Sequence, residues 1–476
     1  MLKDPPFDNM VGWLLAGLIC FSLQGLATAD TDPYCFSDDH DPYNLFATKT
    51  AYEVVRDKRL KIGVVPDCTP VMIWGLFRHG TRYPHEDEIK QQMGLSTLRD
   101  TILRNSPQDM DMCNEDIDLL KDWSYNVNMS EADLLTESGV TELQLLAKRL
   151  RSNFPDVLNA HYTEERFKIR YTSKERTKQS AEAFTTELFG GPIGLSENFI
   201  DDDLLEPNHN CSVWKTSTQS EGLKRETEKF RNSKMMNSLI HKVGSRMGFK
   251  YNLTGKTMHD IYDMCRFDKA WNFKTHSPWC SPFEKHHLKV MEYDEDLDYY
   301  YRSGYGNPFT AKLGCPLIRD MIETLNSRTQ VNTTEESTGP SAVFNFAHSL
   351  TLRAALIKLG IAKDNYPITA DTFSTSEKRQ WRTAFLTPFA GNLLAVLYKC
   401  ADQQYRVMFF LNEQYVEYER CKVGLCDWSY IYSTFKSEID PSRCNRDFCE
   451  TSGSSLVVPT IMLMGLVLLN MFTRFY

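Results

Sequence analysis

The stretch VMIWGLF at residues 71–77, followed at once by RHGTR at residues 78–82, decides how this chain is expected to fold. An apolar run of seven residues predicts a buried strand. The strand ends in a turn that carries Arg78, His79 and Arg82. Ligands of open α/β sheets bind beyond the carboxyl ends of the strands, so a site is expected at this turn.

The same order of strand, basic turn and helix occurs twice more. Residues 167–172 predict a strand that leads to Arg176, and residues 342–346 predict one that leads to His348; apolar residues then recur at helical spacing after each turn. Strands that alternate with helices indicate an α/β domain with a largely parallel sheet. The three turns are therefore expected to meet at one edge of that sheet and to bring together Arg78, His79, Arg82, Arg176 and His348.

The remaining segments divide the chain further. Residues 136–154 predict a capped amphipathic helix, residues 391–400 another helix and residues 405–411 a strand. Residues 200–310 are rich in Asn, Lys, His and aromatic residues and lack the order of strand, turn and helix. We interpret them, together with residues 101–130, as insertions that form a helical cap over the edge of the sheet.

The two ends of the chain predict a secretory route. Residues 13–26 are mostly apolar and precede Ala-Thr-Ala at residues 27–29, a pattern typical of signal-peptidase cleavage; an uncleaved membrane anchor is the alternative. At the other end, small residues at 452–455 lead into an apolar run at 456–472. This order favours a GPI anchor, with a transmembrane helix as the alternative. We expect an extracellular or cell-surface protein that is held at the membrane through its C-terminus.

The expected organisation is a signal peptide at 1–29, an α/β core at 30–100, 131–199 and 311–445, cap insertions at 101–130 and 200–310, and a tail with the anchor signal at 446–476.

Cysteine usage agrees with an oxidising compartment. Of the 13 cysteines, Cys20 lies in the expected signal peptide, and the remaining even number suits complete pairing. Short spacing favours three local pairs, although spacing does not fix the connectivity: Cys421 with Cys426, Cys444 with Cys449 and Cys265 with Cys280. Four Asn-x-Ser/Thr sites permit glycosylation, at Asn128, Asn210, Asn252 and Asn332.

The residues of the first turn suit phosphoryl transfer. The neutral imidazole of His79 can attack phosphorus and hold the phosphoryl group covalently. Guanidinium groups stabilise the charged oxygens because each offers a planar fork of donors and stays protonated. The net charge of −9 argues against a general nucleic-acid binder, so an anionic small substrate would depend on the local arginine cluster. The sequence contains no Cys-x-x-Cys or His-Glu-x-x-His zinc pattern.

These residues resemble those of a known family. RHGTRYP at 78–84, with Arg176 and His348, is similar to the histidine phosphatases of the acid phosphatase and phytase branch, and SPWCSPF at 277–283 is similar to its multiple inositol polyphosphate phosphatase subgroup. The resemblance spans most of residues 40–430. It implies a three-layer α/β sandwich with a mostly parallel central sheet and an inserted helical cap, no metal or organic cofactor, and inositol phosphates such as inositol hexakisphosphate as substrates. It also implies that His79 is the nucleophile and that the phosphate is held by Arg78, Arg82, Arg176 and His348.

One position departs from that pattern. The subgroup follows its distal histidine with Ala-Glu, whose carboxyl protonates the leaving group, whereas this chain reads His348-Ser349-Leu350. Leucine cannot donate a proton, and general acid catalysis contributes roughly 10²–10⁴-fold. Three hypotheses follow: a phosphatase with a substitute donor or a slow donor-free route, a catalytically impaired surface protein that binds polyphosphorylated ligands, and an adhesion protein.

Overall fold

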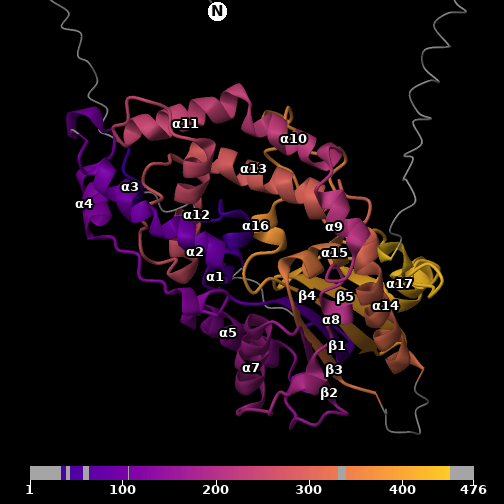
Figure 1. The fold of residues 1–476 in the computed structure, drawn as a ribbon. Coiled ribbons are helices and arrows are strands. Elements are labelled where there is room, and N and C mark those ends of the chain that lie inside the picture. Colours follow the sequence, from indigo (N-terminus) through magenta and orange to yellow (C-terminus); the bar gives the residue numbers. More distant parts are fainter. Residues whose placement is uncertain (1–33, 39–42, 57–63, 106, 331–338, 451–476) are drawn as a thin grey trace, which may run out of the picture. The chain divides into compact units, whose positions relative to one another are not determined.

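The computed structural model describes residues 34–38, 43–56, 64–105, 107–330 and 339–450 (Figure 1). The expected signal peptide at 1–29 and the apolar tail at 456–472 lie outside these residues. Within the described residues, no helix combines the length and the apolar character that a membrane crossing requires.

Seven strands of the described residues form one sheet in the order β2–β3–β1–β4–β5–β6, with β7 paired to β5. The strands expected at 71–77, 167–172, 342–346 and 405–411 are all present. The bounds are β1 Cys68–Arg78, β2 Phe167–Tyr171, β3 Ala342–Ala347, β4 Asn392–Cys400, β5 Tyr405–Leu411, β6 Gln414–Tyr415 and β7 Leu425–Asp427.

The strand directions explain why three basic turns meet. β3 pairs in parallel with both β1 and β2, so these three strands end at the same edge of the sheet. β4 is antiparallel to both of its neighbours, β1 and β5. Among the strands of five or more residues, β4 alone therefore runs against the others, and the α/β class with a mostly parallel central sheet is confirmed.

The prediction of a helix at 391–400 is wrong, because this segment is strand β4. Its sequence, NLLAVLYKC, is almost wholly buried between β1 and β5. A short apolar run that is buried on both faces has no alternation of polar and apolar residues, so periodicity alone does not separate a central strand from a buried helix.

Helices cover both faces of the sheet. Because side chains of a strand alternate between its faces, Ile73 and Phe77 pack with residues of α5 and α7, whereas Met72 and Trp74 pack with residues of α14 and α15. α5 and α7 lie side by side (Figure 1). This arrangement of helices, sheet and helices is the expected three-layer sandwich. The bounds are α5 Glu137–Asn153, α7 Glu175–Phe189, α14 Thr310–Thr329 and α15 Ser349–Leu359.

Residues 200–310 contain helices and no strand. One of them, α12, packs against α2 and α5, and α10 packs against α13. The described residues form a single compact unit, so the division into core and cap remains a prediction. The bounds are α8 Asp202–Leu205, α9 Ser212–Thr218, α10 Glu221–Arg231, α11 Lys234–Arg246, α12 Gly255–Trp271 and α13 Lys285–Ser303. The remaining helices are α1 Tyr52–Val55, α2 Glu86–Met93, α3 Leu95–Ile102, α4 Asn114–Asp122, α6 Pro155–Leu158, α16 Thr383–Leu386 and α17 Trp428–Lys436.

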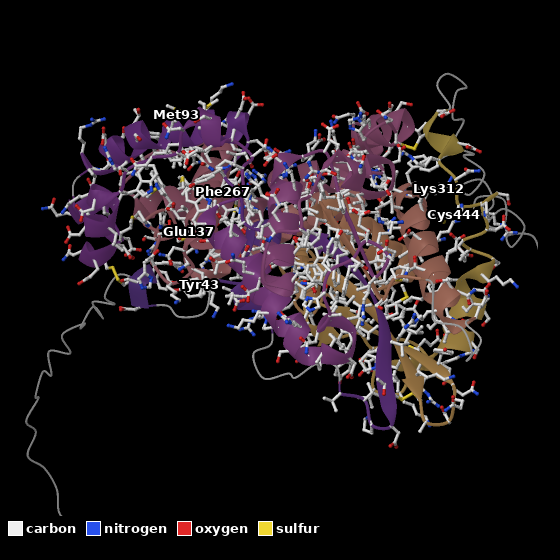
Figure 2. All side chains as sticks on the ribbon, turned by 90° about the horizontal axis from the view of Figure 1, so that it is seen from below. Tyr43, Met93, Glu137, Phe267, Lys312 and Cys444 are labelled. Carbon is white, nitrogen blue, oxygen red and sulfur yellow. A yellow bond between two sulfur atoms is a disulfide. The ribbon has the colours of Figure 1, made fainter. Side chains whose placement is uncertain are left out.

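Six disulfides join the cysteines of the described residues, which suits a secreted protein. The expected pairs Cys265–Cys280 and Cys421–Cys426 are confirmed. The expected pair Cys444–Cys449 is wrong: Cys444, labelled in Figure 2, bonds to Cys315, and Cys449 bonds to Cys211. The fold brings α14 and the start of α9 to the C-terminal segment, which spacing along the chain does not reveal. The other two disulfides are Cys35–Cys113 and Cys68–Cys400.

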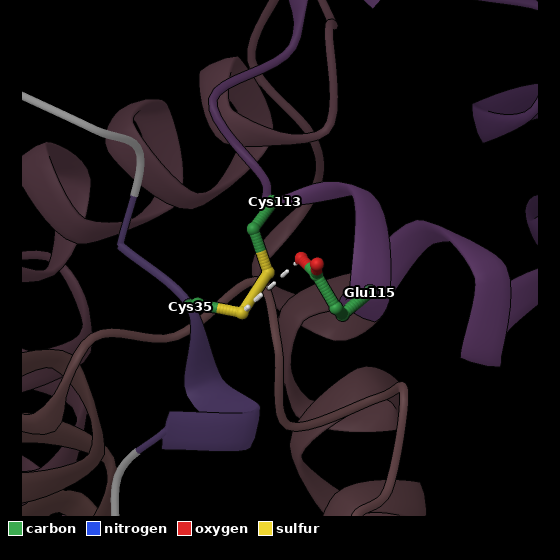
Figure 3. A group of neighbouring side chains, drawn as sticks. All are labelled: Cys35, Cys113 and Glu115. Carbon is green, nitrogen blue, oxygen red and sulfur yellow. Dashed lines mark hydrogen bonds between the residues drawn. A yellow bond between two sulfur atoms is a disulfide. The ribbon is translucent and has the colours of Figure 1, made fainter.

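The disulfide between Cys35 and Cys113 has a carboxylate beside it (Figure 3). One Glu115 oxygen lies 4.0 Å from the Cys35 sulfur. A disulfide sulfur carries no hydrogen and is not a thiolate, so the group neither forms a thiol hydrogen bond nor offers thiolate ligands to a metal.

Candidate active site

The turn after β1 is held by the backbones of its neighbours. The Arg78 N–H donates to the Gly391 carbonyl at 2.8 Å, and the His79 N–H donates to the Ala347 carbonyl at 3.0 Å. The His79 carbonyl in turn accepts from the Ala390 N–H at 3.0 Å. The nucleophile candidate is thus fixed at the point where β1, β3 and the segment before β4 meet.

The next two residues lie tightly against α5. A side-chain carbon at Gly80 would come within 2.5 Å of the Gly139 carbonyl oxygen, so only glycine fits there. The buried Glu142 carboxylate accepts from the Thr81 N–H at 2.8 Å and from the Thr81 hydroxyl at 3.1 Å. Burial raises the pKa of Glu142 to about 7. The first turn of α5 and Glu142 therefore fix the shape of the loop.

The hydrogen bonding and the electrostatic surroundings of His79 favour a neutral imidazole. Its Nδ1 lies 2.9 Å from the Gly80 carbonyl, which can only accept, so Nδ1 carries the proton and Nε2 keeps a free lone pair. Burial, followed by the charges of nearby Arg78 and Arg176, holds the pKa of His79 well below its usual value. The ring therefore stays neutral, and nucleophilic at Nε2, under mildly acidic conditions.

One of the three arginines, Arg78, is almost fully buried. Arg78 is 4% exposed, donates to the carbonyls of Thr48 and Thr387, and stacks over the Phe389 ring at 4.3 Å. Burial and the charge of Arg82 lower the pKa of Arg78 to about 9, which still leaves the guanidinium protonated near neutrality.

The other two arginines share an acidic partner. Arg82 and Arg176 lie 3.8 Å and 3.4 Å from the same oxygen of Asp133. Burial, and then the charge of Arg82, lower the pKa of Arg176. Neighbouring guanidinium groups repel one another, and a bound phosphate group would offset that repulsion.

The distal histidine lies opposite the first. The rings of His348 and His79 meet edge to face with centroids 5.7 Å apart. His348 Nε2 lies 3.1 Å from the Thr172 hydroxyl, at the end of β2. Burial and the charge of Arg176 hold the pKa of His348 well below its usual value. The structure thus brings together all of the side chains that the sequence places at the three turns.

Leu350 has a different environment. It lies in the first turn of α15 and packs, partly buried, against a small apolar cluster that includes Trp214, Leu313 and the Cys211–Cys449 disulfide. The side chain at the expected donor position therefore contributes to packing.

The sequence did not single out several basic residues near the site. Arg353, which is 3% exposed and stacks on Tyr299 at 4.4 Å, is close enough to lower the pKa of Arg78. Lys49 bridges Glu88 and Asp263 at 2.9 and 3.0 Å. The position of Arg353 in the helix that follows His348 was the available signal, since a basic residue in the interior of an apolar helix requires an internal partner.

Helix α12, from the expected cap, reaches the same loop. The Trp271 indole N–H donates to the Arg82 carbonyl at 3.2 Å. The Phe267 ring, labelled in Figure 2, lies 5.8 Å from the Arg82 guanidinium and 4.4 Å from the Lys49 ammonium. Aromatic residues of α12 therefore support the cationic side chains.

Comparisons with known proteins give the family of the chain. The family model for the histidine phosphatase superfamily (branch 2) matches residues 72–417. Multiple inositol polyphosphate phosphatase 1 of Drosophila melanogaster is 35% identical over 456 residues, which cover 92% of this chain and 94% of the relative.

Two solved structures share the fold. The phytase from D. castellii has a TM-score of 0.69 at 16% identity and covers 85% of this chain and 87% of its own. Multiple inositol polyphosphate phosphatase of Bifidobacterium longum, in complex with inositol hexasulfate, has a TM-score of 0.62 at 14% identity and covers 84% of this chain and 98% of its own. The chain therefore belongs to branch 2 of the histidine phosphatase superfamily and is a phosphoric monoester hydrolase.

Proposed function

We propose that this protein removes phosphate from inositol polyphosphates, such as inositol hexakisphosphate, through a phosphohistidine on His79. The observation that carries the proposal is the state of His79: its Nδ1 faces the Gly80 carbonyl, its Nε2 therefore keeps a lone pair, and arginine charges surround it. A nucleophile of this kind needs no base to activate it, because the ring is already neutral.

The reaction has two steps. His79 Nε2 attacks phosphorus while Arg78, Arg82, Arg176 and His348 hold the phosphate oxygens, and the ester oxygen leaves as an alcohol once it is protonated. Water then attacks the phosphohistidine and releases inorganic phosphate. Positioning and charge stabilisation supply most of the rate enhancement in such transfers, and the buried guanidinium groups provide both.

The substrate class is supported by charge and by likeness. Beyond the four phosphate-holding residues, Lys49 and Arg353 add cationic side chains near the site. They do so although the net charge of the whole chain is −9. The fly relative is named for inositol polyphosphates, and the bifidobacterial neighbour was solved with inositol hexasulfate. An inositol ring with several phosphates suits a site with more cations than one phosphate requires.

Leu350 favours a second candidate, a surface protein that binds polyphosphorylated ligands and turns them over poorly. Both candidates predict binding, so turnover separates them.

The test is phosphate release from inositol hexakisphosphate by the purified protein, with acid-labile phosphate trapped on the chain by rapid acid quenching. We expect turnover and a trapped phosphohistidine in the wild type and neither in His79→Ala. The exposed His161→Ala is the matched control and should behave as the wild type does. Binding without release by the wild type would support the second candidate, and an equal trapped signal in His79→Ala would remove His79 as the nucleophile.

We further propose that the protein is secreted and is held at the cell surface by a GPI anchor added near Ser452. The disulfides support secretion, and the small residues before the apolar tail support the anchor. Phosphatidylinositol-specific phospholipase should release the protein from intact cells. Retention while a control GPI protein is released would favour a membrane-spanning tail.

A further inference from the structure

We propose that Glu206 donates the proton to the leaving group, in place of the carboxylate missing at Leu350. This proposal rests on the phosphohistidine reaction proposed above. It requires a carboxyl group that lies near the phosphate-holding arginines, on the side where the ester oxygen leaves, and that is not already committed to another interaction.

Glu206 lies at the edge of the sheet where the three parallel strands end. It follows directly after α8, whose start is tied to the end of β2: the Asp201 N–H donates to the Tyr171 carbonyl at 3.0 Å, and the Ser173 N–H donates to Asp202 at 2.7 Å. The end of α8 is tied to α15, because the Thr351 hydroxyl donates to the Leu205 carbonyl at 2.7 Å. Glu206 therefore lies between the end of β2, which precedes the helix that carries Arg176, and the helix that begins after His348.

The electrostatics place the Glu206 carboxylate beside the site. Burial and Arg82 lower the pKa of Arg176, and the negative charges of Asp133 and Glu206 oppose that shift, so Glu206 lies within electrostatic reach of a phosphate-holding guanidinium. Its Oε2 atom is buried and has no hydrogen-bond partner among the described residues. A buried carboxylate oxygen without a partner is costly, and a functional role accounts for its retention.

The other carboxylates around the arginines are committed. Although burial alone would raise the pKa of Asp133, its hydrogen bond from His85 and the charges of Arg176 and Arg82 hold that pKa below its usual value. Lys49 and Arg82 likewise overcome burial and hold the pKa of Glu88 well below its usual range. A group with a low pKa stays ionised and is a poor donor.

Glu142 is committed in another way. It accepts hydrogen bonds from the N–H and hydroxyl groups of Thr81 and from the Tyr52 N–H, on the side of the loop that faces α5. Its oxygens are used to fix the loop. Among these neighbouring carboxylates, Glu206 is thus the one with a buried oxygen that has no hydrogen-bond partner among the described residues.

The proposed steps balance as follows. The bond between His79 Nε2 and phosphorus forms as the bond from phosphorus to the ester oxygen breaks, and the Glu206 carboxyl proton passes to that oxygen, which leaves as an alcohol. In the second step the Glu206 carboxylate accepts a proton from water as the water oxygen bonds to phosphorus. The bond to His79 then breaks and inorganic phosphate leaves, with Glu206 protonated again.

The test compares Glu206→Gln with the wild type on two esters. Inositol hexakisphosphate has alkoxide leaving groups that need a proton, whereas para-nitrophenyl phosphate releases a stable anion and needs almost none. We expect Glu206→Gln to lose roughly 10²-fold in kcat/KM on inositol hexakisphosphate, a loss typical of a missing general acid, and only a few-fold on the aryl ester. The exposed Glu197→Gln is the matched control and should lose nothing on either.

The two substrates also separate donation from positioning. If Glu206 only orients Arg176, both esters lose activity alike and the proposal is overturned; no loss on either ester overturns it as well. Affinity for inositol hexasulfate shows whether Glu206→Gln has folded. If it has not, Glu206→Asp replaces it and should show the same preference for the aryl ester to a smaller degree. A wild type that forms no phosphohistidine with either ester contradicts the proposed function itself, whereas an active wild type beside an unaffected Glu206→Gln contradicts only the role of Glu206.

Discussion

The part of the site proposed to hold phosphate, the phosphate half, and the part proposed to supply the proton, the donor half, differ in how their residues are held. In the phosphate half, which comprises Arg78, His79, Arg82, Arg176 and His348, the side chains follow the ends of parallel strands and are buried or half-buried. In the donor half, which comprises Glu206 and Leu350, one residue follows a four-residue helix and the other packs against a disulfide.

This difference separates two requirements of the chemistry. Binding a phosphate needs several charges in fixed positions, and the ends of a rigid sheet can hold that many groups together. Protonating an alkoxide needs one carboxyl within reach, and any element near the leaving oxygen can supply it. The phosphate half is therefore expected to tolerate no substitution, while a donor can move to another element of the chain.

The largest effect is expected for Arg78→Ala in the phosphate half. Removal of one preorganised charged donor costs roughly 10²–10³-fold in kcat. Because Arg78 is proposed to hold the phosphate group and not the leaving group, the loss should be equal for inositol hexakisphosphate and para-nitrophenyl phosphate. The exposed Arg104→Ala, whose guanidinium bonds only to Thr101 among the described contacts, is the control. A loss confined to the inositol ester would contradict the separation of the two halves.

The Cys211–Cys449 disulfide tests how firmly the donor half is held. It closes a separation of 238 residues, and removal of such a bridge by paired Cys→Ser changes should cost about 2–5 kcal/mol of stability in denaturant unfolding. Cys211 follows Glu206 closely in the chain, so the folded variant should lose more activity on the inositol ester than on the aryl ester. Paired changes at Cys421 and Cys426, separated by only 5 residues, are the control. Equal losses on both esters would show that the bridge supports the two halves alike.

Much of the phosphate half could be predicted from the sequence, because each of its residues follows an apolar run that a buried strand requires. The same reasoning failed at β4, where a fully buried run has no alternation to separate strand from helix. The donor half was less accessible. Glu206 comes within electrostatic reach of Arg176 because α8 is bonded to the end of β2 and to the first turn of α15. The Cys211–Cys449 pair joins segments that lie far apart in the chain.

Leu350→Glu offers the donor half a second carboxyl. In the Glu206→Gln background it should restore about tenfold of the lost inositol hexakisphosphate turnover while changing aryl phosphate turnover little, since a carboxyl at the subgroup position can reach the leaving oxygen. Leu350 packs against apolar side chains, so the change should also cost about 1–3 kcal/mol of stability. Leu350→Gln, which adds polarity without a proton donor of this kind, should destabilise without restoring turnover. Recovery in Leu350→Gln would show that polarity, not proton donation, limits the donor half.

The smallest effect is a shift of the pH profile by Arg176→Gln, and its direction follows from the charges around His79. Burial comes first among the causes that hold the pKa of His79 low, and the charges of Arg78, Arg176, His348 and Arg82 add to it. Because these charges disfavour the imidazolium, removal of Arg176 should raise the pKa of His79, and the neutral nucleophile should then be lost at a higher pH.

The acid limb of kcat/KM reports the free enzyme, and it should move upward by about one pH unit or less. Substrate ionisation contributes equally to both proteins when the same ester is used. The difference between their acid limbs therefore reflects the ionisation of groups on the protein. Glu206→Gln is the informative counterpart: it removes none of the positive charges that act on His79, so its acid limb should stay in place. An acid limb that moves downward in Arg176→Gln would mean that Arg176 does not set the charge state of His79, and the electrostatic account of the phosphate half would fail.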